Sequence, residues 1–221
     1  GSSPDTMARF MLLFALALAE PEPTPWPPVF HAVLAKNRSG EISHTDLYYD
    51  WPRGGNLHID RRPGQPEFFD NERQNGSTYY YTAGGSCKVI EMGVGLLPPD
   101  WLAGAAYRGE TSVTSPLSET PRACHVWGKG EAMGNYTGPF IVYYEDVSTG
   151  RPARWQFFDG MTFDVLDWLP GETATAKDWQ VPANCFVAEN SSLQSSSELV
   201  RLWRSGFKAQ EDMDEEIAVF V

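Results

Sequence analysis

Apolar and polar residues alternate along short stretches of this chain with a period of two. Between Gly40 and Trp51, the odd-numbered positions from Ser43 onward form one face, which becomes apolar and aromatic toward Trp51. Such alternation is typical of a β-strand with one buried face, whereas a helix repeats every three or four residues. The pattern therefore predicts a protein built mainly of strands.

Similar runs recur through the chain and are separated by turns rich in Gly, Asn and Pro. The predicted strands are residues 30–36, 40–51, 56–62, 77–82, 86–94, 123–129, 140–146, 152–158 and 161–169, and residues 179–186 are expected to end the folded body. Two prolines interrupt the pattern before residues 101–107, which we expect to form a short helical turn, and residues 111–122 are expected to be a polar loop.

Short connections without intervening helical patterns favour antiparallel pairing of the strands. The predicted fold class is mainly β: a single strongly curved antiparallel sheet, half-barrel or barrel-like, with one or two short helices. The concave side of such a sheet is filled either by its own side chains or by a ligand.

The two ends of the chain differ from this body. Residues 1–19 have the pattern of a signal peptide, with an upstream extension at residues 1–6, a basic residue, an apolar run and a small-x-small ending. The apolar run is about half as long as a membrane-spanning helix requires, so no transmembrane span is predicted. Residues 20–29 form a proline-rich lead-in, residues 30–188 the antiparallel β domain, and residues 189–221 a Ser-rich linker and acidic tail.

Asparagine and cysteine residues independently favour the secretory pathway. Asn-x-Ser/Thr acceptors for glycosylation occur at Asn37, Asn75, Asn135 and Asn190. The cysteines, which lack the spacing of a zinc or redox site, are Cys87, Cys124 and Cys185. In an oxidising lumen we expect one disulfide and one buried or intermolecular thiol, with the pairing left open. The predicted localisation is secreted, or the lumen of the secretory pathway.

Charge and aromatic content indicate which classes of partner the protein can bind. The formal net charge of −12, without a basic stripe, argues against nucleic acid as a partner. The 8 Trp, 9 Tyr and 12 Phe exceed what an ordinary core needs and favour a curved sheet that lines a cavity or contact surface.

Many of these aromatic residues lie on neighbouring predicted strands. An aromatic concavity binds apolar or ring-bearing ligands. The candidate ligand-binding residues are Tyr48, Trp51, Tyr80, Trp127, Tyr144, Trp155 and Phe157. The alternative, left open at even weight, is that these rings fill the core of the sheet itself.

Signals for catalysis are weak. The histidines are scattered singly, and the Gly-Gly-Ser-Cys-Lys string at 84–88 lacks the last glycine of a nucleophile elbow. Glu145 with Asp146, and Asp164 with Asp167, are candidate carboxylate pairs for glycoside chemistry, although turn formation explains the first pair better. No catalytic residue, metal site or cofactor is predicted, and weak calcium binding by the acidic tail is left open.

Several strings resemble, in the same order from Pro23 to Phe186, a little-characterised family of plant and algal secreted proteins. They include DLYYDW at 46–51, NGSTYYYT at 75–82 and CHVW at 124–127, together with YYED at 143–146 and RPARW at 151–155. Some members of that family are labelled glycosyl-group transferases. The strand pattern is also similar in style to ependymin-related proteins and to the bacterial lipoprotein-carrier fold. That second resemblance implies a curved antiparallel sheet with an apolar pocket.

The leading hypothesis is a secreted or lumenal glycoprotein that binds a hydrophobic, lipid-like ligand in the concave aromatic face, without covalent chemistry. The runner-up, which the inherited label implies, is a glycan-acting enzyme of the secretory pathway. A third reading is a structural cell-surface or matrix protein that assembles through its glycans, its acidic tail or its unpaired cysteine.

Overall fold

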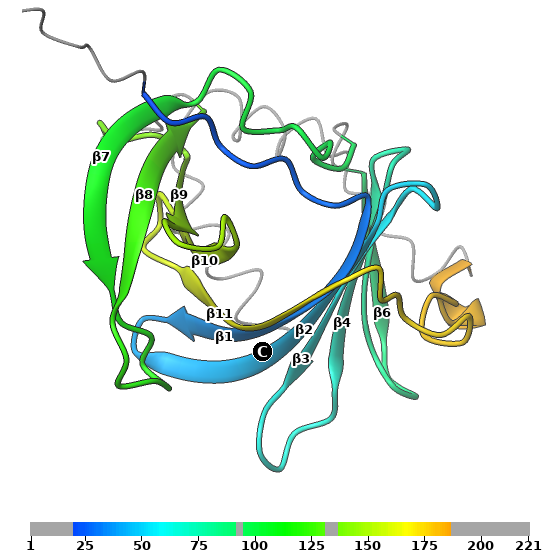
Figure 1. Cartoon of the computed structure of the whole chain (residues 1–221). Coiled ribbons are helices and arrows are strands. Elements are labelled where there is room, and N and C mark those ends of the chain that lie inside the picture. The colour runs from blue at the N-terminus through cyan, green and yellow to red at the C-terminus, as the bar shows by residue number, and fades with distance from the viewer. Residues whose placement is uncertain (1–19, 92–94, 131–136, 187–221) are drawn as a thin grey trace, which may run out of the picture.

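A computed structural model describes residues 20–91, 95–130 and 137–186 (Figure 1). The first group of strands comprises β1 (Val29–Arg38), β2 (Glu41–Asp50), β3 (Gly55–Arg61), β4 (Phe68–Arg73), β5 (Ser77–Thr82) and β6 (Cys87–Glu91). The second group comprises β7 (Ala106–Val113), β8 (Arg122–Lys129), β9 (Ile141–Asp146), β10 (Pro152–Phe157) and β11 (Thr162–Pro170). One short 3-10 helix, η1 (Ala183–Phe186), follows the last strand.

All of these strands belong to one antiparallel sheet of 11 strands in the order β6-β5-β4-β3-β2-β1-β11-β10-β9-β8-β7. Each group is a meander in which neighbours in sequence pair with each other, and the pairing of β1 with β11 joins the two meanders. The sheet is strongly curved but not closed, because β6 and β7 form its two edges. The predicted fold class is confirmed.

Three local predictions were wrong. Residues 68–73 and 106–113 form the strands β4 and β7, although no strand was predicted at either place. Residues 179–186, which are expected to end the folded body, contain the end of a turn and then η1. The helical turn expected at 101–107 is limited to turns that end at Gly104, after which β7 begins.

The main core lies on the concave side of the sheet. We call it the concave aromatic cluster; its large members are Trp26, Phe30, Tyr49, Trp101, Trp127, Tyr143, Trp155, Phe163 and Trp168. Most of these rings come from β1, β2 and β8–β11, but Trp26 belongs to the lead-in and Trp101 to the segment before β7. The lead-in crosses the open side of the curved sheet in Figure 1 and covers this cluster.

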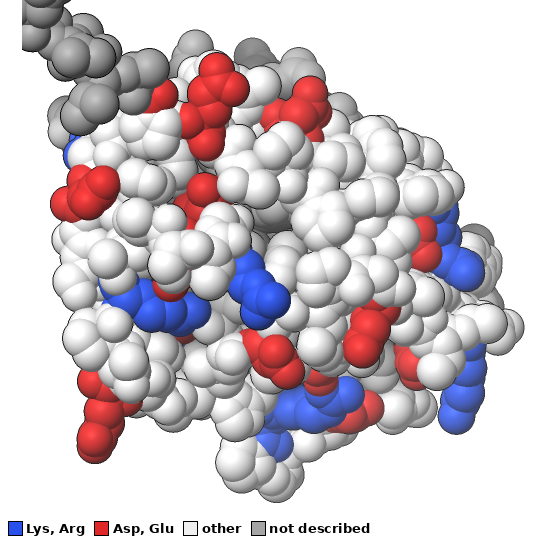
Figure 2. All heavy atoms as spheres, viewed as in Figure 1, with Lys and Arg blue, Asp and Glu red and all other residues white. Residues whose placement is uncertain are grey.

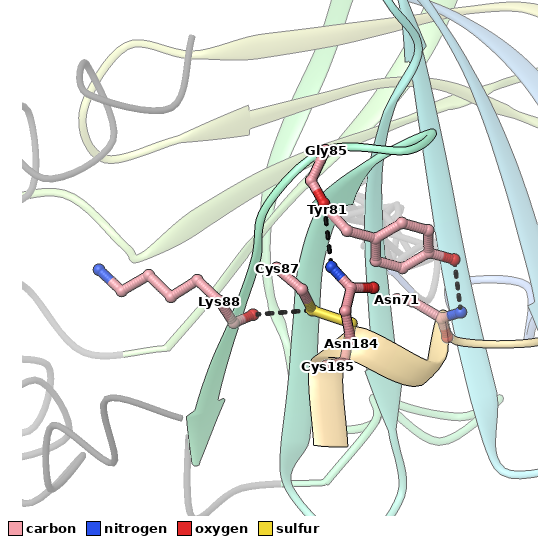
Figure 3. The surroundings of a disulfide bond; sticks show 7 residues. All are labelled: Asn71, Tyr81, Gly85, Cys87, Lys88, Asn184 and Cys185. Atoms are coloured by element: carbon pink, nitrogen blue, oxygen red, sulfur yellow. Dashed lines mark hydrogen bonds between the residues drawn. A yellow bond between two sulfur atoms is a disulfide. The ribbon is translucent and has the colours of Figure 1, made fainter. Parts of the chain in front are cut away.

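A second core covers the opposite, convex side of β3–β6. Leu57 and Ile59 of β3 pack there against Ala174 and Trp179, which follow β11. A disulfide between Cys87 of β6 and Cys185 of η1 anchors this segment (Figure 3). Beside it, the Asn184 side chain donates a hydrogen bond to the Gly85 carbonyl at 2.9 Å.

The expectation of one disulfide and one unpaired cysteine is therefore confirmed. The unpaired residue, Cys124, is fully buried in a small cluster with Val113 and Ala153. Its thiol has no access to a second chain, which removes the cysteine-linked route to assembly.

Two of the glycosylation candidates lie at hairpin turns. Asn37 stands at the end of β1, where its side-chain oxygen accepts a hydrogen bond from the Gly40 amide, and Asn75 is exposed in the turn between β4 and β5. Asn135, Asn190, the signal-peptide segment, the Ser-rich linker and the acidic tail lie outside the described residues. Among the described helices, none has the length and apolar character needed to cross a membrane.

Candidate functional site: the concave face of the sheet

Strand alternation and register divide the concave face into two halves. Around β1 and β8–β11 the inward positions are mostly apolar and buried, with Lys36, His125 and Glu145 as polar exceptions. On β3–β6 the inward positions are mostly polar and half-buried, so solvent reaches them. The space-filling view along the same direction shows a hollow near the centre of this side (Figure 2).

The apolar half is filled by the protein itself. Trp127 is 1% exposed and Trp155 is 5% exposed. The Trp26 ring packs edge-on against Trp101 and Trp155, with centroid distances of 5.3 and 5.8 Å. Side chains from outside the sheet thus occupy the space above these strands.

Hydrogen bonds hold the lead-in in place over this half. The indole N–H of Trp26 donates to the Tyr143 hydroxyl at 3.2 Å, and the Trp26 amide donates to the Pro99 carbonyl at 2.8 Å. Glu145, which is buried, accepts from both the amide and the hydroxyl of Thr24, at 3.0 and 3.1 Å. Burial raises the pKa of Glu145, and the two bonds from Thr24 partly offset that rise.

The predicted ligand-binding aromatics fall into two groups. Concave positions hold Trp51, Tyr80, Trp127, Trp155 and Phe157. Two others lie on the convex face: Tyr48 stacks on His31 with ring centroids 4.3 Å apart, and Tyr144 packs beside Cys124. Of the concave set, Tyr80 alone belongs to the polar half.

The polar half contains a cluster of side chains of which the sequence predicted only Tyr80 as a ligand-binding residue. We call it the concave polar cluster; its members are Asn56, His58, Asp60, Asp70, Glu72 and Tyr80. Register brings them together, because Asn56 lies opposite Glu72, and Asp70 lies between His58 and Tyr80 on the flanking strands. The His58 ring meets Phe163 of β11 edge-on at 6.1 Å, which places the cluster beside the aromatic half.

Some members of this cluster are well paired. The Lys36 ammonium lies 2.6 Å from one Asp60 oxygen, and the Thr45 hydroxyl donates to the other. Burial acts to raise the pKa of Asp60, but these partners outweigh it and lower the pKa. The Asn56 amide donates to Glu72 at 2.7 Å and lies 3.2 Å from His58 Nε2.

Asp70 is the exception. Its Oδ1 atom is buried and has no hydrogen-bond partner among the described residues. Burial, with the nearby Glu72 carboxylate as the second cause, raises the pKa of Asp70 well above its ordinary value. Burial likewise lowers the pKa of His58, so that this ring is neutral at neutral pH. Buried polar atoms are nearly always paired, so an unpaired carboxyl oxygen calls for an explanation.

The carboxylate pairs suggested by the sequence do not assemble. Glu145 faces inward and binds Thr24, while the next residue, Asp146, caps its own turn through Ser148 and Thr149. Asp164 is fully buried and paired with Arg154 at 2.6 Å, and Asp167 bonds to the adjacent Trp168 amide. Within residues 20–91, 95–130 and 137–186, no group of three or more His, Cys, Asp or Glu side chains could hold a metal ion.

A family model covers residues 25–185, which span the lead-in, the sheet and the disulfide, and it is described as a domain of unknown function, DUF8395. The chain belongs to the DUF8395 family. The DUF8395 region therefore contains both halves of the concave face together with the segments that cover them. No curated protein matches the sequence.

Solved structures show only distant likeness to the DUF8395 chain. An uncharacterized conserved protein from Thermus thermophilus is 14% identical with a TM-score of 0.47, over 72% of this chain and 88% of that one. MucB is 13% identical with a TM-score of 0.40, over 73% of this chain and 60% of its own length. MucB in its complex with MucA from Pseudomonas aeruginosa is 15% identical with a TM-score of 0.36, over 72% of this chain and 57% of its own length.

Likeness at this level carries no argument about function. The comparisons do not connect the DUF8395 chain with plant or algal secreted proteins or with ependymin-related proteins, so those resemblances stay predictions.

Proposed function

We propose that this protein is a secreted or lumenal glycoprotein that binds an amphipathic, lipid-like ligand on its concave face without covalent chemistry. The observation that carries the proposal is the contrast between the two halves of that face. One half is closed and aromatic, and the other is reachable by solvent and contains a buried, unpaired carboxyl.

An apolar ligand has surface to contact in the polar half without any rearrangement. Phe68, Tyr80 and Ile90 face inward there and are half-buried, and Phe68 stacks on Tyr80 with centroids 6.1 Å apart. Ligand pockets typically combine such apolar surface with a few convergent polar groups. The apolar part of the ligand lies against these rings and Phe163, and its polar end meets the concave polar cluster.

Covalent chemistry supports the proposed compartment. A disulfide that links segments far apart in sequence persists in an oxidising environment. The predicted signal peptide and the acceptors at Asn37, Asn75, Asn135 and Asn190 agree with export and glycosylation, which stay proposals.

The test is native mass spectrometry of the full chain secreted from a eukaryotic host, followed by extraction and identification of the small molecules bound. We expect a co-purifying lipid-like molecule at about one per chain. In the delipidated protein, a fluorescent apolar probe should bind to the wild type and much more weakly to Phe68→Asp. The matched control is Leu166→Asp, because Leu166 is 37% exposed on β11. If the delipidated protein binds no fatty acid, phospholipid or apolar probe, the proposal is wrong.

One observation favours the glycan-acting alternative. Asp70 and Glu72 share the inward face of β4, and an acid with a raised pKa beside a second carboxyl is the arrangement used for general acid catalysis. Turnover of an oligosaccharide by the wild type that is lost in both Asp70→Asn and Glu72→Gln would support this alternative over simple binding.

A further inference from the structure

We propose that the concave polar cluster binds an organic ammonium group, held between the Asp70 and Glu72 carboxyls and the rings of Phe68 and Tyr80. The inference rests on the proposed function, since it names the polar end of the ligand that the concave face takes. It covers primary and quaternary amines alike, because the same charge and ring contacts serve both.

Charge is the first reason. Asp60, Asp70 and Glu72 all face inward on β3 and β4. Lys36 is committed to Asp60 at 2.6 Å, and Glu72 receives a hydrogen bond from a neutral amide. Lys88 shares this face only at the edge strand β6, opposite Tyr80. Ionisation of Asp70 beside Glu72 would therefore give the pair an excess of negative charge, which a bound cation would balance.

The unpaired atom is the second reason. Asp70 Oδ1 is buried without a partner, although a carboxyl inside a protein is normally hydrogen-bonded or paired. A primary ammonium group could donate a hydrogen bond to this oxygen, and a quaternary one could supply its counter-charge. An ammonium ligand would thus supply the hydrogen bond or the counter-charge that Asp70 Oδ1 lacks.

The rings are the third reason. Phe68 and Tyr80 stack with an angle of 18° between their planes; Phe68 lies two residues before Asp70 on β4, and Tyr80 lies opposite Asp70 on β5. Aromatic faces attract cations through their quadrupole, and quaternary ammonium groups are commonly bound in aromatic cages. His58 is neutral because burial lowers its pKa, so it adds no competing positive charge.

The same features disfavour other head groups. A carboxylate or phosphate would add a negative charge beside Glu72 and would oppose the ionisation of Asp70. A hydroxyl could form hydrogen bonds but would leave the charge of the pair unbalanced. An ammonium group is therefore the preferred chemistry for this position.

Release of a proton from Asp70 is a second expected sign of ammonium binding. The groups that face Asp70 are His58 and Asp60 from β3, Glu72 from β4, Tyr80 from β5 and Lys36 from β1. With no ligand, Asp70 holds its proton to higher pH than an ordinary carboxyl. Binding of a cation favours the ionised form, so binding releases a proton and becomes tighter as pH rises through the pKa of Asp70.

The experiment is isothermal titration calorimetry on the full, glycosylated, delipidated chain with four probes that share one alkyl chain: hexyltrimethylammonium, hexylammonium, hexanol and hexanoate. We expect the two ammonium probes to bind about tenfold more tightly than hexanol, and hexanoate to bind most weakly. Repeating the titration in two buffers of different ionisation enthalpy should show proton release for the ammonium probes only.

Substitutions test which residues bind the ammonium group. Asp70→Asn should lower the affinity for the ammonium probes about tenfold and leave hexanol unchanged. Glu67→Gln, a change at an exposed carboxylate paired with Arg61, is the matched control and should change nothing. If Asp70→Asn does not fold, Tyr80→Leu serves instead, with a loss of ammonium binding that hexanol does not share.

The outcomes separate the two proposals. Equal affinity for hexanol and the ammonium probes, or tightest binding of hexanoate, overturns the ammonium site while the amphipathic ligand stands. Binding of tetramethylammonium as tight as that of hexyltrimethylammonium supports the ammonium site but contradicts the apolar contact. Absence of binding by all these probes overturns both.

Discussion

The two halves of the concave face are built from the same alternating strands, yet they differ in what covers them. Around β8–β11, the lead-in and the segment before β7 lie over the inward side, so large aromatic rings are buried there. Around β3–β6, the segment after β11 lies over the outward side, so Leu57, Ile59 and Cys87 are buried there instead.

The core thus changes sides along a single sheet. Because the outward side of β3–β6 already supplies the burial that those strands need for stability, their inward side is free to carry polar groups. The candidate site therefore lies on the inward side of β3–β6, which the protein does not need for its hydrophobic core. Substitutions in the two halves test the contrast between them, and they follow in order of decreasing expected effect.

Replacement of one aromatic residue in each half tests the contrast directly. Trp127→Ala removes a buried ring that contacts Tyr107 and Tyr143, and should cost about 3–5 kcal/mol of unfolding free energy. Tyr80→Ala removes a half-buried ring and should cost about 1 kcal/mol. Urea denaturation measures both, and equal costs would contradict the assignment of structural and binding roles.

Loss of the disulfide should weaken the polar half specifically. Cys87→Ala with Cys185→Ala opens a loop of 98 residues and should cost about 2–5 kcal/mol. Hydrogen exchange should show protection lost first in β5 and β6, and last in β8 and β9. Cys124→Ala, which leaves the cross-link intact, should cost about 1 kcal/mol. Uniform loss of protection over the sheet would show that the halves are not separate in stability.

Release of the lead-in should affect the aromatic half alone. Glu145→Gln weakens a charged pair of hydrogen bonds to Thr24 and should cost about 1–2 kcal/mol. Limited proteolysis should then cut more readily within residues 20–26. The control is Glu41→Gln, at an exposed carboxylate on β2. Unchanged proteolysis would mean that Trp26 packing, rather than Glu145, holds the lead-in.

The smallest expected effect is the pH dependence of Asp70. Its pKa is raised in the folded protein, so from about pH 4 upward the unfolded chain loses this proton first and folding stability falls with rising pH. Asp70→Asn should therefore match the wild type at pH 3 and become relatively more stable as pH rises. Thermal unfolding over pH 3–8 measures this difference.

Asp146 supplies a control of opposite sign. Burial acts to raise its pKa, but hydrogen bonds from Ser148 and Thr149 outweigh burial and lower it. Its contribution to stability is present above the ordinary carboxyl pKa and is lost as pH falls through the lowered value, so Asp146→Asn should cost stability at pH 7 and not at low pH. The same sign for both variants would contradict the assigned environment of Asp70.

Much of the fold was predictable, because most strands alternate clearly between Gly- and Asn-containing turns. β4 was missed since its inward positions carry Asp70 and Glu72, which look like solvent-exposed residues. β7 was missed since it is an edge strand with mostly exposed positions. Trp179 and Cys185 were expected only to end the folded body, and the sequence did not indicate that they are buried by packing against the outside of the sheet.

The site was less predictable. Pairs such as Tyr48 with Tyr49 and Tyr143 with Tyr144 place one ring on each face, and composition alone does not say which. The concave polar cluster draws residues from three separate strands that meet only through register. No local motif marks it. Single polar residues at alternate positions of otherwise apolar strands were the available signal.

The central place of β1 has a consequence for how the chain reaches its native state. On one side β1 pairs with β2 almost as soon as both are synthesised, but its other partner is β11, with Phe30 against Pro170 and Asn37 against Thr162. At synthesis rates of about 5–20 residues per second, this edge of β1 waits roughly 10 s for its partner. Joining of the two meanders is thus a late, long-range step, and until it occurs β1 has an unpaired edge that can pair with wrong partners.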